Sequence, residues 1–386
     1  MSKLTDHLPA DWRDGGFVGR IQLAEGPTPI LIRAGRVIDV SRAAPTTADL
    51  LALKGAASVE GRDLGDLEDF AFAPAWEDRD PDRPQLLSPL DLQCVKASGV
   101  TFAVSAVERV IEERARGDAA RARDIRAALA ERVGADLSAV KPGSEQAAVL
   151  KDALLADGLW SQYLEVAIGK DAEIFTKAPV LSSVGWGDWV GVRADSHWNN
   201  PEPEVVIVCD PTGRPVGAAL GNDVNLRDIE GRSALLLGKA KDNNASAAIG
   251  PLIRLFDDGF TMDHIRAATI RLEVSGDDGF VMTGSSSMSL ISRDPLDLIG
   301  QTIGASHQYP DGFALYLGTM FAPIDDRDAP GKGFTHKAGD VVRVSSERLG
   351  VLENKVTSCE QAPPWTLGVS GLMRNLAGRG LLGAGA

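Results

Sequence analysis

The stretch PEPEVVIVCDPTGRPVGAALGND, residues 201–223, predicts a β-hairpin with carboxylates at its open end. Side chains alternate along a strand, so Glu202 and Glu204 point to the same face. Pro203 has no backbone N–H to donate, which places it at the start or edge of a strand. The turn DPTGRP, in which Gly213 supplies backbone freedom, then reverses the chain.

The register of this hairpin brings three carboxylates together. A turn centred between Thr212 and Gly213 sets Glu202 opposite Asp223 and Glu204 opposite a glycine, with opposed Cβ atoms about 4.5–5.5 Å apart. Such crowding raises the pKa of each carboxyl group, and a divalent cation relieves it. An all-oxygen donor set favours Mg²⁺ over zinc, and Mn²⁺ or Ca²⁺ are alternatives to Mg²⁺. The other interpretation is a solvated strand start, with Asp223 capping a turn.

Composition restricts the class of partner. The chain has 386 residues, 44% of them apolar, and a net charge of −14, so we expect repulsion from nucleic acid and from anionic membranes. No run of 18 apolar residues and no signal peptide is found, so no membrane association is expected. Three scattered cysteines fit a reducing cytoplasm. A small-molecule substrate is the expected partner.

The order of patterns along the chain predicts two domains. Short strand-like runs before residue 60 indicate a small N-terminal β-rich domain, 1–85, ending in an acidic, proline-bearing linker, 61–90. The larger domain, 86–386, begins with helical periodicity, including a helix over 145–167, and continues as strands from about residue 173. The small-residue end, 371–386, is predicted to be a frayed tail.

Several motifs in this order resemble the fumarylacetoacetate hydrolase superfamily. Besides the Glu-x-Glu pair and NDVNLRD (222–228), they are EIFTKAP (173–179), LGKAKDNNASAAIGP (237–251), YLGTMFAP (316–323) and HKAGDVVRVSSERLGVLENKV (336–356). The resemblance covers the chain from about residue 85. It implies an α+β fold with a mixed β-roll catalytic domain, and a homodimer or a dimer of dimers.

Three further segments resemble the branch of that superfamily that dehydrates 2-keto-3-deoxy sugar acids: SGVTFAVSAVER (98–109), RADSHWNNPEPE (193–204) and GSSSMSLISR (284–293). Many hydrolases of the superfamily have a water-activating histidine where this chain has Ser105. The resemblance therefore implies Mg²⁺-dependent elimination of water, for example from 2-keto-3-deoxy-D-xylonate to 2,5-dioxopentanoate in D-xylose degradation. The alternatives are an acylpyruvate or diketo-acid hydrolase, and a non-catalytic protein with a structural cation.

The resemblance also suggests roles for single residues. Counting back from Gly250 and Pro251 without gaps favours Lys241 over Lys239 as the family lysine, and we expect burial beside a metal to lower its pKa so that it acts as a base. The full set of expected site residues is Lys241 and Glu173 for proton transfer, Ser105, Ser286 and Thr319 for substrate binding, and Glu202, Glu204 and Asp223 for the metal.

Overall fold

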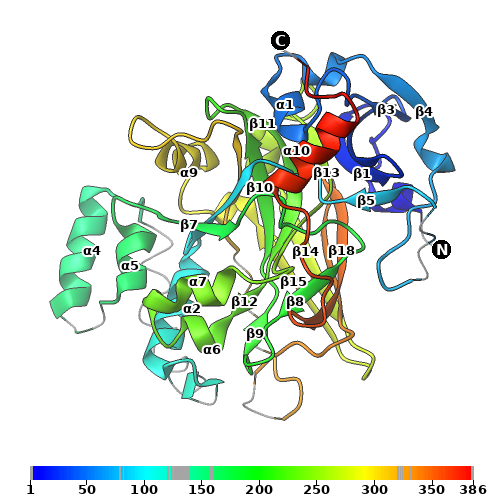
Figure 1. Ribbon diagram of the computed structural model, residues 1–386. Helices are drawn as coiled ribbons and strands as arrows, with labels where there is room; N and C mark the ends of the chain where they lie inside the picture. Colours follow the sequence, from blue (N-terminus) through cyan, green and yellow to red (C-terminus); the bar gives the residue numbers. More distant parts are fainter. Residues whose placement is uncertain are drawn as a thin grey trace.

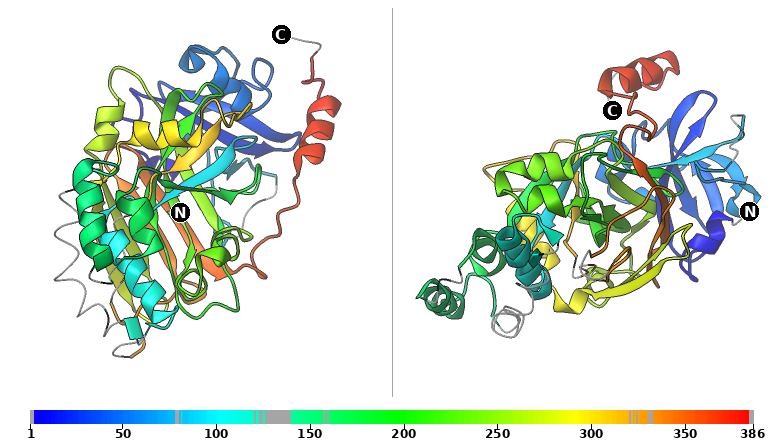
Figure 2. Two further views of the ribbon diagram at one scale, coloured as in Figure 1. Left: turned by 90° about the vertical axis from the view of Figure 1, so that its left-hand side faces the viewer. Right: turned by 90° about the horizontal axis from the view of Figure 1, so that it is seen from below.

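The computed structural model describes residues 3–77, 80, 82–119, 121–122, 125, 140–156, 158, 160–319, 321, 323, 325–329 and 333–383. Two β-sheets pack against each other at its centre, and helices surround them (Figures 1 and 2). The predicted α+β class is confirmed.

The larger sheet has eleven strands in the order β4-β3-β2-β1-β13-β11-β10-β16-β6-β7, with β5 beside β1. Its paired strands are antiparallel except β16 and β6, which are parallel. The strands are β1 (Gly16–Leu23), β2 (Gly26–Arg33), β3 (Arg36–Asp39), β4 (Arg62–Asp66), β5 (Gln85–Leu87), β6 (Cys94–Gly99), β7 (Glu173–Ala178), β10 (Pro203–Cys209), β11 (Pro215–Asp223), β13 (Ala247–Leu255) and β16 (Phe313–Tyr316).

The smaller sheet has five strands in the order β15-β14-β17-β18-β8, and a separate two-stranded ladder joins β9 to β12. Its strands are β8 (Trp189–Val192), β14 (Thr269–Ser275), β15 (Val281–Ser287), β17 (Val341–Ser346) and β18 (Gly350–Ser358), and the ladder consists of β9 (Asn199–Asn200) and β12 (Asn225–Leu226). Predicted strand 269–275 coincides with β14.

Strand β10 is apolar from Val205 to Cys209 because both of its faces are buried there. Val205 and Ile207 belong to the core that it shares with Val344 of the smaller sheet. Val206 belongs to a second core that includes Leu50 of α1. An uninterrupted apolar run is what a strand covered on both sides requires.

The helices are α1 (Thr47–Ala52), α2 (Ala103–Ala115), α4 (Glu145–Ala156), α5 (Gln162–Ile168), α6 (Arg227–Glu230), α7 (Leu237–Lys241), α8 (Met262–Arg266), α9 (Pro295–Thr302) and α10 (Val369–Gly378). Helices α2, α6 and α7 gather at one end of the β10–β11 hairpin (Figure 1). The helix predicted over 145–167 is two helices, α4 and α5, and Ser161 caps the second through its hydroxyl. No helix in the described part of the chain has the length and hydropathy of a membrane span.

Two sequence predictions about flexible segments are wrong. The predicted linker 61–90 contributes β4 and β5 to the larger sheet. The predicted frayed tail forms most of α10, which buries Leu372 and Leu376 against Leu181. Figure 2 shows α10 at the margin of the molecule, beside the N-terminal strands. The division into domains 1–85 and 86–386 stays a proposal. Strand β1 of the first pairs directly with β13 of the second, so the two would share one sheet.

Candidate active site

The open end of the β10–β11 hairpin holds the three predicted carboxylates. Glu204 lies opposite Gly221, and the backbone N–H of Asp223 donates to the carbonyl oxygen of Glu202 at 3.0 Å, as the predicted register requires. The bulge in this hairpin lies beyond Val208, near the turn, and leaves the register at the open end unchanged. All three carboxylates are buried, and each offers an oxygen within 4.8 Å of the others.

Gly221 provides space for an aromatic ring beside the carboxylates. A Cβ atom on Gly221 would lie 2.3 Å from Cε1 of Tyr316. The Tyr316 hydroxyl donates to the carbonyl oxygen of Ala248 at 2.6 Å, which fixes the ring in place. Because Gly221 has no side chain, the buried Tyr316 ring can pack directly against the backbone at the open end of the hairpin.

Two lysines neutralise part of the negative charge. Lys241 Nζ, on α7, lies 2.5 Å from Glu202 Oε2 and 3.0 Å from Asp223 Oδ2. Lys177 Nζ, on β7, lies 2.8 Å from the other oxygen of Asp223. Lys239 instead pairs with Asp195 at the surface. Of the two candidate lysines, Lys241 is thus the one beside the carboxylates.

The expected lowering of the Lys241 pKa is not found. Burial by itself would lower this pKa, but the adjacent carboxylates of Asp223 and Glu202 outweigh burial and raise it. Lys241 is therefore an ammonium group, a hydrogen-bond donor and a source of positive charge. Glu173 lines the same pocket, and burial raises the pKa of its carboxyl group.

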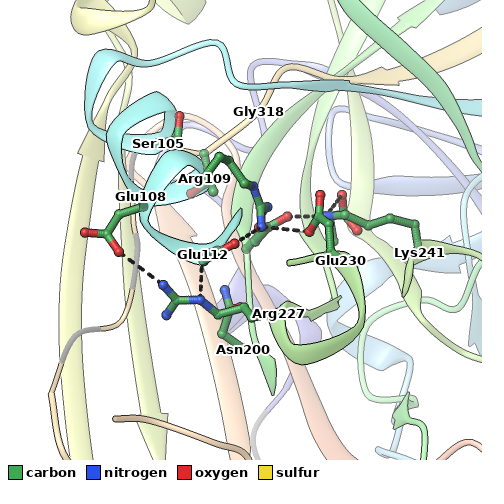
Figure 3. A network of polar contacts seen from close by, with 12 residues as sticks. Ser105, Glu108, Arg109, Glu112, Asn200, Arg227, Glu230, Lys241 and Gly318 are labelled. Carbon is green, nitrogen blue, oxygen red and sulfur yellow. Dashed lines mark hydrogen bonds and ion pairs between the residues drawn. The ribbon is translucent and has the colours of Figure 1, made fainter. Parts of the chain in front are cut away.

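Helix α2 reaches the carboxylates through Arg109, which the sequence did not single out. Its guanidinium lies 2.7 Å from Glu202, 2.7 Å from Glu112 and 2.7 Å from Glu230. A second buried arginine, Arg227, binds Glu112 at 2.6 Å and extends the network (Figure 3). Burial raises the pKa of Glu230 to about 7, against the lowering effect of Arg109.

Acidic groups outnumber basic groups in this pocket. Seven carboxylates line it, and with Lys177 behind Asp223 the cations number four, so three negative charges remain when all groups are ionised. A hard divalent cation on Glu202, Glu204 and Asp223 fits this excess and this donor set. The lining groups are Glu108, Glu112, Glu173, Glu202, Glu204, Asp223 and Glu230, with Arg109, Arg227 and Lys241.

Of the four remaining expected residues, three line the pocket and one does not. Glu173, Ser105 and Thr319 line the same pocket as the carboxylates. The Ser105 hydroxyl donates to the carbonyl oxygen of Phe102 at 2.8 Å, and its oxygen accepts from the Phe102 N–H at 3.3 Å and so caps α2. Ser286 is buried on β15 in the smaller sheet and is not among the lining residues.

Sequence reasoning missed several buried charged residues in and behind the pocket, among them Arg109, Lys177, Arg227 and Glu230. Arg109 and Glu112, three residues apart, share a helix face, which was a usable signal for a buried charged face. Arg227 and Lys177 lie inside quoted motifs, NDVNLRD and EIFTKAP, but spacing alone does not distinguish a surface cation from a buried one.

Comparison with known proteins gives the fold and a set of relatives. The chain is 32% identical over 183 residues to 2-dehydro-3-deoxy-D-arabinonate dehydratase of Saccharolobus solfataricus, and 30% identical over 196 residues to a probable 2-keto-3-deoxyxylonate dehydratase of Haloferax volcanii. The matched segments cover 47% and 51% of this chain, and 57% and 64% of those relatives. No family model matches the chain.

Solved structures extend the likeness to most of the chain. A 2-keto-3-deoxy-D-arabinonate dehydratase complexed with magnesium and 2,5-dioxopentanoate matches with a TM-score of 0.60, 22% identity and 89% coverage of this chain and 99% of that one. Fumarylacetoacetate hydrolase from Exiguobacterium antarcticum matches with a TM-score of 0.51, 18% identity and the same two coverages. The chain has the fumarylacetoacetate hydrolase fold. The fold implied by the resemblance of the motifs is thereby confirmed, and the pocket lies at the end of the β10–β11 hairpin.

Proposed function

We propose that this protein is a divalent-metal-dependent dehydratase that eliminates water from a 2-keto-3-deoxy sugar acid. The observation that carries the proposal is the buried triad of Glu202, Glu204 and Asp223 with the ammonium of Lys241 against it. The two dehydratases matched by sequence support the same reaction class.

The triad would hold Mg²⁺, or another cation that prefers oxygen ligands. When bound, the cation supplies a Lewis acid for the carboxylate and 2-keto oxygens of the substrate and stabilises negative charge on an enolate. Lys241 places a second positive charge near the keto oxygen and can donate a hydrogen bond to the departing C4 hydroxyl, which would leave as water with the proton that Glu173 takes from C3. Glu173, with its raised pKa, is suited to remove the C3 proton.

Ser105 supports elimination over hydrolysis. Hydrolysis of a diketo acid requires a base that activates a water molecule, and a serine hydroxyl is too weak a base near neutral pH. The Ser105 hydroxyl also already donates to the backbone of Phe102. Thr319 remains the proposed partner of the substrate carboxylate, since it lines the pocket beside Gly318.

The finer proposal concerns the substrate and the assembly. A five-carbon acid, 2-keto-3-deoxy-D-xylonate or its arabinonate counterpart, would give 2,5-dioxopentanoate, the compound found with magnesium in the structurally similar dehydratase. This reaction fits D-xylose degradation in the cytoplasm. We also propose a homodimer or a dimer of dimers, which light scattering would test.

Mass spectrometry of reaction products tests the reaction class. The protein is incubated with Mg²⁺ and, separately, with five- and six-carbon 2-keto-3-deoxy acids and with an acylpyruvate. We expect a product lighter by one water molecule from a sugar acid, and little pyruvate from the acylpyruvate. Rapid Mg²⁺-dependent release of pyruvate, with no dehydration of any sugar acid, would replace the dehydratase proposal with the hydrolase alternative.

A further inference from the structure

Two asparagines of the pocket have buried polar atoms that no described residue contacts through a hydrogen bond. Asn225 on β12 lies opposite Asn200 on β9, and both residues line the pocket. Asn225 is 1% exposed and Asn200 is 2% exposed. Among the described residues, neither side-chain polar atom of Asn225 has a hydrogen-bond partner, and Oδ1 of Asn200 has none. The Asn200 amide nitrogen donates to the carbonyl oxygen of Pro201 at 2.9 Å.

Unpaired amides are costly inside a protein, because burial removes the hydrogen bonds that they make with water. Residues that face each other across an antiparallel pair have neighbouring Cβ atoms, yet these two amides do not bond to each other. Together they present N–H donors from Asn225 and carbonyl acceptors from both residues. A hydroxyl group can accept a hydrogen bond from the Asn225 amide nitrogen and donate one to either carbonyl oxygen of the pair.

The two asparagines lie two residues beyond the carboxylates, Asn225 after Asp223 and Asn200 before Glu202. Asn225 follows Asp223 by two residues, which in extended backbone corresponds to about 6.6 Å. Figure 3 shows Asn200 beside Arg227, on the side of the network away from Lys241. A ligand held at the triad by one end would therefore reach the asparagines with its other end.

We propose that Asn225 and Asn200 form the subsite that recognises the terminal hydroxyl group, at C5, of a 2-keto acid held at the triad. The identity of that acid rests on the proposed function. The subsite replaces Ser286, which lies outside the pocket, and Ser105, whose hydroxyl caps α2, as the source of hydroxyl recognition.

Isothermal titration calorimetry with two acids that cannot undergo the elimination tests this subsite. With Mg²⁺ present, the protein is titrated with 5-hydroxy-2-oxopentanoate and with 2-oxopentanoate, both of which lack a C4 hydroxyl. We expect the hydroxylated acid to bind about tenfold more tightly to the unaltered protein. Asn225→Ala and the near-isosteric Asn225→Leu should each abolish this preference while binding 2-oxopentanoate as the unaltered protein does. Asn200→Ser should reduce the preference.

Asn199→Ala is the matched control. Asn199 precedes Asn200 on β9, does not line the pocket and accepts a hydrogen bond from the His336 N–H at 3.0 Å. This variant should keep the preference even if its melting temperature falls. An unaltered protein without preference, or a folded Asn225→Ala protein that retains it, overturns the subsite. Preferential binding without dehydration of any sugar acid would instead refute the proposed function and support the subsite.

Discussion

The three carboxylates at the hairpin end differ in how their charge is balanced. Glu202 lies against Arg109 and Lys241, and Asp223 lies between two lysines. Glu204 accepts a hydrogen bond from the backbone N–H of Gly318 at 2.6 Å, and no ion pair to it is found among the described residues. Burial, followed by repulsion from Asp223 and Glu202, raises the pKa of Glu204 well above its ordinary value. Of these three carboxylates, ionised Glu204 therefore destabilises the folded protein most when no metal is bound.

Glu204→Gln should separate stability from metal binding. With chelator present, the variant should unfold with a free energy higher by about 1 kcal/mol or more at neutral pH, because it removes a charge that the fold disfavours. Its affinity for Mn²⁺, measured by electron paramagnetic resonance, should fall at least tenfold. Folded Glu204 holds its proton more tightly than the unfolded chain does, so the contribution of Glu204 to stability in chelator should be lost as pH rises above about 4.5, and the stability gained by Glu204→Gln should grow over the same range.

Glu202→Gln is the contrasting variant. It leaves Arg109 and Lys241 with less negative charge, so both its stability and its Mn²⁺ affinity should fall. A Glu204→Gln protein that melts below the unaltered protein in chelator would show that Glu204 is not destabilising.

The two neighbouring lysines should differ sharply in their effect on turnover. Lys241→Met removes the ammonium beside the triad and should lower kcat by about 10²–10⁴. Lys239→Met removes an exposed pair with Asp195 and should leave kcat within about twofold, as surface ion pairs contribute little. Steady-state kinetics with a 2-keto-3-deoxy pentonate measures both. Loss of kcat in Lys239→Met, with Lys241→Met active, would reverse the assignment.

At the scale of elements, the site depends on how α2, α6 and α7 meet the hairpin. Arg109 of α2 joins Glu202 at the start of β10 to Glu230 of α6, while Lys241 of α7 approaches from the other side (Figure 3). The hairpin itself could be predicted, because alternation and turn residues determine its register locally. The contact between Arg109 and Glu202 spans 93 residues, so it depends on packing that spacing does not encode.

Segments with a clear local pattern could be predicted, whereas segments that need a covering element from elsewhere in the chain could not. The run TIRLEVS alternates apolar and polar residues and is β14. The end of the chain was predicted to fray because of its small residues, yet Leu372 and Leu376 are four residues apart and form the buried face of α10. Such a face is stable only if another element covers it, and the covering Leu181 is remote in the sequence.

Arg109→Gln should weaken the attachment of α2 and the metal site together. The change leaves Glu202, Glu112 and Glu230 buried without their shared cation, and breaking a buried ion pair in this way costs about 3–5 kcal/mol. Hydrogen exchange should accelerate in residues 103–115, and Mn²⁺ affinity should fall. Arg109→Lys keeps the charge and should recover part of both. Unchanged exchange and unchanged affinity in Arg109→Gln would mean that Arg109 does not position Glu202.

At the scale of the whole molecule, stability should depend on a divalent cation, because the fold concentrates negative charge in one pocket of a chain whose net charge is already −14. A ligand that binds only the folded state adds about 2.7 kcal/mol to the free energy of unfolding at 100 times its Kd. We therefore expect Mg²⁺ to raise the melting temperature in a saturable way. NaCl at matched ionic strength controls for screening, and Asp223→Asn, which removes a ligand, should lose the Mg²⁺-specific rise. If Asp223→Asn and the unaltered protein gain the same stability from Mg²⁺, the cation acts at the acidic surface and the triad is not its site.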